Sequence, residues 1–123
     1  MTIREAIETC DSLKPNRFSY FQKVSWLNEL DGMIKAEIID THTKPDTVIF
    51  AGYDDNTDSD TVLLVEAPYS GIYIHFLLAE IDFYNDELTS YGNSISIFDK
   101  AYLQFAAYYN RKYTPLQKNG ITL

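Results

Sequence analysis

The spacing of apolar residues predicts two helices in the first third of the chain. The first covers residues 3–13, because apolar side chains recur at helical spacing after a capping box formed by Thr2 and Glu5. The second runs from a similar box that begins at Ser19 to about Thr41, along an apolar stripe of Val24, Leu27, Leu30, Ile34 and Ile38. Both patterns are typical of helices that bury one face against a core.

Two further helices are predicted in the second half. The third extends from Pro68, which suits the first position of a helix, to about Leu88, and its few polar positions indicate a central, buried element. A strand is the competing interpretation of its apolar alternation at Ile72, Ile74, Phe76 and Leu78, although the length of the segment favours a helix. The dipeptide at residues 92–93 is expected to break the chain. A fourth helix should then pack antiparallel on the third through Ile95, Phe98, Tyr102, Phe105 and Tyr109.

The segment between the second and third helices has a different pattern. Residues 47–50 and 61–65 are β-prone runs on either side of a polar loop at residues 53–60, and they are expected to pair as a hairpin or to pack as extended strands. The predicted fold class is therefore mainly α: a four-helix bundle-like domain with a small β-hairpin or extended insertion between helices 2 and 3. Residues 1–113 are expected to form this single helical domain, and residues 114–123 a C-terminal tail.

Composition supports one folded domain. The chain has 123 residues, and its ten Tyr and seven Phe provide enough apolar surface to argue against disorder. Cys10 is the only cysteine, so no intramolecular disulfide is possible and a reducing cytosol is the expected compartment. The sequence shows neither a secretory signal nor an apolar run of membrane-spanning length, so no membrane association is expected.

Charge is distributed unevenly along the chain. The net charge is −8, and residues 45–99 contain no Lys or Arg. From Lys100 onward the sequence carries cations and no acid, so a basic C-terminal end follows an acidic middle. Direct nucleic-acid binding is not expected, because a phosphate-binding surface needs clustered cations. A solvated acidic face that serves solubility is the plainest interpretation of the middle segment.

The acidic loop invites a calcium interpretation that the spacing does not support. Asp54, Asn56 and Asp58 match the first ligands of an EF-hand loop, but this register places Ser59 where Gly is needed and Val65 where the bidentate acid belongs. Whether the loop binds a cation in another way stays open. A solvated loop is preferred, and no metal or cofactor is assigned.

No other group of residues predicts a catalytic site. His42 and His75 lack the neighbours that transition-metal sites require, and His75 is expected to pack within its helix. The carboxylates of Glu80, Asp82 and Glu87 have no companion base, nucleophile or phosphate loop, so a structural role is expected and the protein is not predicted to be an enzyme. Cys10 lies on the apolar stripe of the first helix, where a small buried side chain is the usual explanation.

Tyrosines concentrate in the C-terminal half. Eight of the ten lie beyond residue 68, and this is more than a two-helix core can bury with satisfied hydroxyls: Tyr69, Tyr73, Tyr84, Tyr91, Tyr102, Tyr108, Tyr109 and Tyr113. Because Tyr is enriched where proteins contact one another, some of these side chains are expected at interfaces.

Several stretches carry a resemblance to a known class of proteins. The chain resembles small structural proteins encoded by phages and prophages of Gram-positive bacteria, the head-tail connectors, also called adaptors or head-completion proteins. The resemblance covers most of the chain except residues 43–60 and the tail. It rests on Trp26–Asp31, Pro68–Tyr69, Ile72–Tyr73, Leu77–Asp82, Tyr84–Asn85, Glu87, Tyr91–Ser94, Phe98, Tyr102 and Tyr108–Arg111.

The resemblance implies a structural protein of the virion, without enzymatic activity, that assembles in the host bacterial cytoplasm. Such a protein forms a homo-oligomeric ring between the portal protein and the tail or neck protein, and its C-terminal arm grips the portal. The partner-binding residues expected on this basis are Tyr108, Tyr109, Arg111, Lys112, Tyr113, Pro115, Leu116, Ile121 and Leu123. An acidic face is expected from Asp54, Asp55, Asp58, Asp60, Asp82, Asp86 and Glu87.

An acidic, DNA-mimicking inhibitor that binds a basic protein is the alternative function. It would show the same charge and the same lack of a catalytic motif. The ring size, the neighbouring protein and the virus do not follow from the sequence.

Overall fold

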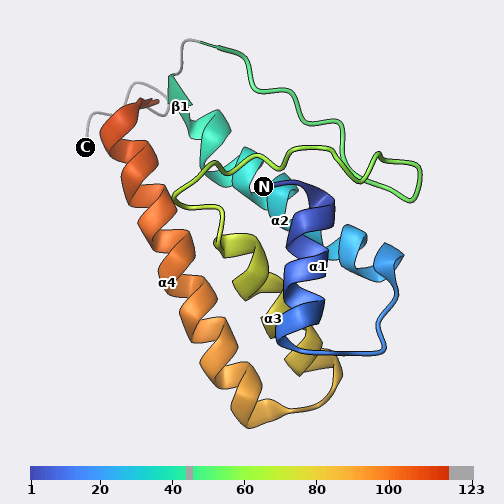
Figure 1. Ribbon diagram of the computed structural model, residues 1–123. Coiled ribbons are helices and arrows are strands. Elements are labelled where there is room, and N and C mark those ends of the chain that lie inside the picture. Colours follow the sequence, from blue (N-terminus) through green and yellow to red (C-terminus); the bar gives the residue numbers. More distant parts are fainter. Residues whose placement is uncertain (44–45, 117–123) are drawn as a thin grey trace.

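The fold is mainly helical, as the sequence predicts. The computed structural model describes residues 1–43 and 46–116, and within them it contains four α-helices: α1 (Ile3–Leu13), α2 (Tyr20–Glu37), α3 (Ile72–Tyr84) and α4 (Leu88–Lys112). A 3₁₀ turn, η1 (Ile39–Thr41), follows α2, and two short strands, β1 (His42–Thr43) and β2 (Thr114–Pro115), pair antiparallel. Figure 1 shows α3 in the middle, with α4 along one side and α1 on the other, while α2 passes behind α1 and runs toward β1 near the C-terminal end of α4.

Helix α3 is the centre of the core. It packs against all three other helices, and Ile72, Tyr73, Leu77 and Ile81 are almost completely buried. The predicted central helix is thus confirmed, and the strand interpretation of its alternating residues is wrong. The helix begins at Ile72 and not at Pro68; residues 67–70 form a turn before it, and the Ala67–Pro68 peptide bond in this turn is cis.

Helices α3 and α4 form the antiparallel pair that the sequence predicts. Phe98, Phe105 and Tyr109 are buried, and the Phe98 and Phe76 rings lie 5.1 Å apart across the pair. The predicted break at residues 92–93 is wrong, since α4 begins at Leu88 and continues through Gly92. The chain reverses earlier, at Asp86, which adopts the left-handed conformation with φ 59°. Packing along a 25-residue helix offsets the roughly 1 kcal/mol that one glycine costs.

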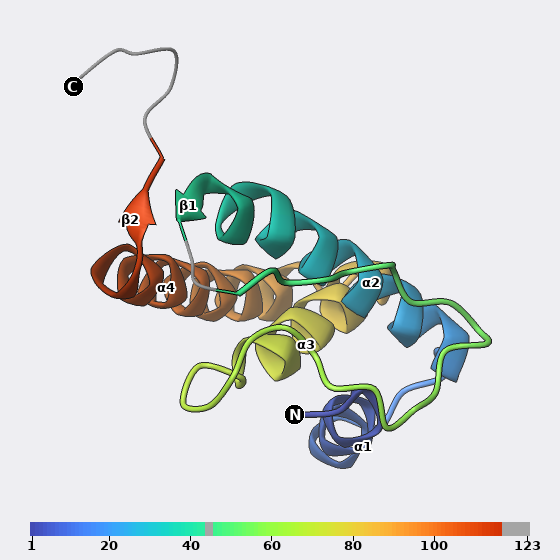
Figure 2. The same cartoon turned by 90° about the horizontal axis from the view of Figure 1, so that it is seen from above.

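The segment between β1 and α3, called the insertion here, is extended. Its described residues, 46–71, run along α2, turn back near residue 56 and return toward α3 (Figures 1 and 2). The two β-prone runs do not pair with each other, so the predicted insertion takes its extended form. Val62 instead forms an isolated bridge with Thr2 at the start of α1, and the backbone N–H of Ile3 donates to the Thr61 carbonyl at 3.0 Å. The β-prone residues thus form extended chain, but the backbone partner of Val62 is Thr2 at the start of α1 and not the other β-prone run.

A buried carboxylate fixes the insertion to the helices. Asp31 of α2 has no exposed surface, and it accepts hydrogen bonds from the hydroxyls of Tyr53 (2.5 Å) and Tyr73 (2.6 Å) and from the Leu64 N–H (3.1 Å). The Tyr73 hydroxyl in turn accepts from the Val65 N–H at 2.7 Å. Burial raises the pKa of Asp31, and the three hydrogen bonds oppose this shift. One side chain therefore holds both the outgoing and the returning part of the insertion.

The helix pairing predicts the effect of truncating the α3–α4 seam. Replacing Phe105, which is 4% exposed, with Ala should lower the free energy of unfolding by about 3–5 kcal/mol, because a cavity replaces a buried ring. Leu103→Ala is the matched control, since Leu103 is 67% exposed on the same helix and its loss should cost less than about 0.5 kcal/mol. Denaturant titration measures both, and equal losses would contradict the packing.

Asp31 predicts a pH effect on stability. Its folded pKa lies above the ordinary value of 3.8, so the folded state holds the proton more tightly than the unfolded state does. The contribution of Asp31 to the free energy of unfolding is fully present below pH 3.8 and is lost as the pH rises through the pKa of Asp31 in the folded state. The free energy of unfolding of the wild type should therefore fall relative to that of Asp31→Asn as the pH rises from 3.8, and then level off. If the difference in free energy of unfolding between the wild type and Asp31→Asn stays constant as the pH rises, the raised pKa of Asp31 is contradicted.

Candidate functional site

An aromatic cluster surrounds the C-terminal end of α4. The Tyr69 ring lies 4.6 Å from that of Tyr108, and the Tyr109 ring lies 4.7 Å from that of Tyr113. A cleft of about 140 Å³ opens beside this cluster. Its lining residues are Ile39, Val48, Leu64, Glu66, Ala67, Phe105, Tyr108, Tyr109, Lys112 and Tyr113. The cleft thus lies between α4 and both parts of the insertion, and its wall contains one acid, Glu66, and one cation, Lys112.

His42 ties the end of α4 to α2. The ring is 7% exposed, and its Nδ1 donates to the Ile38 carbonyl at 2.6 Å. Its Nε2 lies 2.6 Å from the side-chain oxygen of Asn110, and the Tyr109 ring meets it edge-on at 5.0 Å. The following residue, Thr43, pairs with Thr114 in the two-strand sheet. This arrangement sets the direction in which the chain leaves α4.

The predicted partner-binding residues fall into three groups. Arg111, Lys112, Pro115 and Leu116 are exposed, and Tyr108 and Tyr113 are half-buried. Tyr109 is buried at 7% exposure, and its ring packs in the core against His42 and Phe105. The last two predicted residues, Ile121 and Leu123, lie outside the described residues.

Two cations make the end of α4 basic. Lys112 lies 5.6 Å from the centre of the Tyr108 ring and 5.4 Å from that of Tyr113, so the rings hold its ammonium group near the cleft. Arg111 is exposed, and no ion pair joins it to another described residue. Positive charge is favourable at a helix C-terminus, where the carbonyl groups point outward. We call Arg111 and Lys112, together with residues 113–116, the basic end.

The loop of the insertion presents four aspartates. Asp54, Asp55, Asp58 and Asp60 are all exposed, and only Asp60 has a cationic partner among the described residues, Arg4 at 3.2 Å. Asp54 and Asp58 accept from backbone N–H groups two residues ahead, which folds the loop into tight turns. No group of three or more His, Cys, Asp or Glu side chains in the described ranges could hold a metal ion. We call these four residues the acidic tip.

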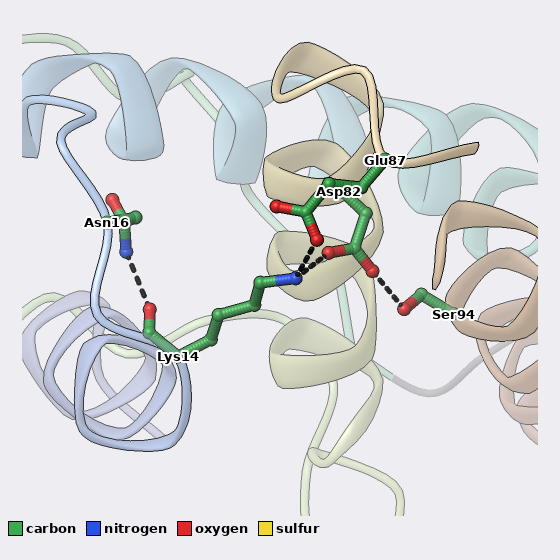
Figure 3. Close-up of polar contacts among 5 residues, drawn as sticks. All are labelled: Lys14, Asn16, Asp82, Glu87 and Ser94. Carbon is green, nitrogen blue, oxygen red and sulfur yellow. Dashed lines mark hydrogen bonds and ion pairs between the residues drawn. The ribbon is translucent and has the colours of Figure 1, made fainter. Parts of the chain in front are cut away.

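Asp82 does not belong to the predicted acidic face. It is 2% exposed at the end of α3, where the ammonium of Lys14 contacts one carboxylate oxygen and the Ser94 hydroxyl donates to the other at 2.6 Å. Lys14 also lies 3.1 Å from Glu87, and Figure 3 shows its side chain reaching both acids from the end of α1. The bond to Asp82 raises the pKa of Lys14. This cluster joins three helices and is best explained as a structural clamp.

The other residues weighed as candidate chemical groups are dispersed. Glu80 is half-buried, and burial, with a smaller effect from Glu29, raises its pKa. Burial raises the pKa of the Cys10 thiol to about 11, so it stays protonated at neutral pH. His75 is half-buried within α3, and Asp86 is exposed at the α3–α4 turn. Glu80 does not join Asp82 and Glu87 at the Lys14 clamp.

Sequence reasoning missed two buried ionic groups. Asp31 interrupts the apolar stripe of α2 between Leu27 and Ile34, and a charge in such a position signals a buried partner. Lys23 is similar: it is 3% exposed, and its ammonium lies 2.7 Å from Asp11. The partners could not be predicted, because each one lies on a different element.

Comparison with known proteins gives no relative. No protein-family model, no curated protein and no solved structure matches the chain. No helix in the described part of the chain has both the length and the apolar character needed to cross a bilayer.

The Lys14 clamp predicts a stability loss that an exposed ion pair does not share. Lys14→Met keeps most of the aliphatic stem but leaves Asp82 buried without its cation, and it should cost about 1–3 kcal/mol, since Lys14 is itself partly exposed. Asp60→Ala is the control, because Asp60 is exposed and its pair with Arg4 should contribute less than about 1 kcal/mol. Thermal and denaturant unfolding measure both. Equal effects would show that the clamp is not buried in solution.

Proposed function

We propose that the chain is a structural protein of a phage or prophage, a head-tail connector that assembles into a ring between portal and tail and has no enzymatic activity. The sequence resemblance suggests this class. The structural observation that carries the proposal is the position of the charges: the acidic tip and the basic end lie on opposite sides of the molecule (Figures 1 and 2).

A ring needs two different faces on each subunit. It repeats one heterologous contact by rotation, so one side of a subunit must complement the other side of its neighbour. An acidic tip and a basic end on opposite sides meet this requirement, and opposite charges also steer the encounter of two subunits. Repulsion from the same acidic surface would let DNA pass without adhering.

The basic end also supplies an arm. Strand β2 leads away from α4, and Leu116 is 54% exposed although its backbone N–H donates to the Thr41 carbonyl at 2.8 Å. Seven further residues follow it in the sequence, and they include Lys118, Ile121 and Leu123. We infer that this arm holds the protein in the assembly, through apolar and cationic contacts with a neighbouring protein.

The charge arrangement predicts salt-dependent association of the purified chain. Self-association should strengthen as the ionic strength falls, because screening weakens contacts between exposed acidic and basic faces. Asp55→Lys at the acidic tip should weaken it several-fold at low salt, whereas Asp99→Lys, the same charge change on α4, should not. Sedimentation across a salt series measures this. Identical profiles at all salt concentrations would contradict an electrostatic ring contact.

Attachment to capsids tests the function itself. Deleting residues 117–123, which keeps β2 and the Leu116 hydrogen bond, should leave the melting temperature nearly unchanged and abolish co-sedimentation with portal-containing capsids. A truncated chain that still attaches, or one that no longer folds, would contradict the role of the arm. A full chain that ignores capsids but binds a basic protein would favour the DNA-mimicking inhibitor instead.

A further inference from the structure

The outgoing part of the insertion contains an extended segment without backbone partners among the described residues. Residues 47–51, called the open edge here, follow an extended path along α2 (Figure 2), with Val48 and Phe50 half-buried and Ile49 82% exposed. This alternation is that of a strand with one face on a core. No backbone–backbone hydrogen bond between described residues involves residues 46–52. The peptide groups of the open edge are therefore available to another strand.

The open edge lacks the usual protection against strand addition. Exposed edges are normally blocked by Lys, by Pro or by a covering element, and residues 46–52 contain neither Lys nor Pro. Acids flank the edge instead: Asp46 precedes it, and Asp54 and Asp55 follow it, all exposed. Two copies of this edge would repel each other if they paired. The chemistry fits an extended segment that carries positive charge and no acid.

The C-terminal segment of the chain has this chemistry. Residues 114–123 contain Lys118 and no acid, and they include the β-prone run Ile121–Leu123. Thr114 and Pro115 already pair as a strand with Thr43 and His42, which are the last described residues before the insertion. The segment is thus able to pair with this part of the chain.

The direction of β2 favours a pairing between molecules. In the antiparallel register Thr114 lies opposite Thr43 and Pro115 opposite His42, and the Leu116 N–H donates to the Thr41 carbonyl. Residues 114–116 therefore run back toward Thr41 and away from Thr47. The open edge of the same chain lies in the opposite direction, so a segment supplied by another molecule meets it more directly.

We propose that the open edge of one copy binds residues 117–123 of a second copy as an added β-strand. Seven extended residues span about 23 Å and the five-residue edge about 17 Å, at about 3.3 Å per residue, so the lengths are compatible. The cleft beside Val48 would receive one apolar side chain of the incoming strand, and the flanking aspartates would attract Lys118. The contact is heterologous, so repetition gives a ring or a filament. The inference rests on the ring contact proposed above and names its donor and acceptor.

The first experiment blocks the acceptor. Ile49→Pro removes a backbone N–H from the open edge, whereas Ile49→Thr keeps that group and changes only the exposed side chain. Neither change removes a hydrogen bond of the described fold, so both variants should keep the wild-type melting temperature. Sedimentation of the purified full-length chain should show association at least ten-fold weaker for Ile49→Pro and within about two-fold of wild type for Ile49→Thr.

The second experiment blocks the donor and then restores the contact by mixing. A chain with Lys118→Glu and Ile121→Asp keeps its open edge but carries an unsuitable strand, so it should be monomeric alone. Mixed in equal amounts with Ile49→Pro, which keeps its C-terminal segment, it should form one-to-one heterodimers. Neither edge-to-edge pairing nor insertion of the segment into its own molecule gives this result.

Three outcomes overturn the proposal: a wild-type chain that stays monomeric at low salt, an Ile49→Pro chain that associates normally, or a mixture that stays monomeric. Because these experiments use the purified chain alone, they can fail while attachment to capsids holds. The reverse result is equally visible, with self-association intact and no binding to capsids.

Discussion

The buried carboxylate of Asp31 is the constraint on which the position of the insertion depends. A charge without exposed surface costs several kcal/mol unless hydrogen bonds satisfy it, so the carboxylate requires its partners to stay in place. Two of these partners, Tyr53 and Leu64, belong to the outgoing and returning parts of the insertion, and the third, Tyr73, belongs to the central helix. The acidic tip lies between the first two. Its orientation therefore follows from an interaction in the core and not from the tip itself.

Internal ion pairing explains the segregation of charge on the surface. Lys14 and Lys23, both in the N-terminal part, are held by Asp82 and Asp11 inside or near the core. Among the described residues, Arg4 is the one cation that forms an ion pair with the acidic tip, at Asp60. Arg111 and Lys112 lie at the C-terminal end of α4, away from the tip. The separation of charge along the sequence thus becomes a separation in space.

The sequence predicted the parts of the fold that depend on helical periodicity. The apolar residues of α1, α2 and α3 and the Phe98 and Phe105 seam were correct, because a helix that packs on a neighbour must repeat its apolar positions every three or four residues. Predictions from local sequence signals were wrong where contacts between residues distant in the sequence determine the structure. Gly92 carries a strong local preference that the packing of α4 overrides, and Pro68 lies in a turn before α3 and not at the start of the helix. The β-prone runs could not reveal that Val62 bridges Thr2. In the candidate site, Arg111 and Lys112 were named as partner-binding residues and are exposed, whereas the burial of Tyr109 and Asp82 depends on His42 and Lys14.

The clip formed by His42, Asn110 and the two short strands has a mechanical consequence. Strand β2 lies alongside β1 and is also bonded at Thr41, so tension directed along β2 loads these hydrogen bonds in parallel and does not break them one at a time. The ring of His42, bonded to Ile38 and close to Asn110, carries the remaining load into α2 and α4 together. A pull on the arm is therefore shared by the two helices that flank α3, and the central helix is spared.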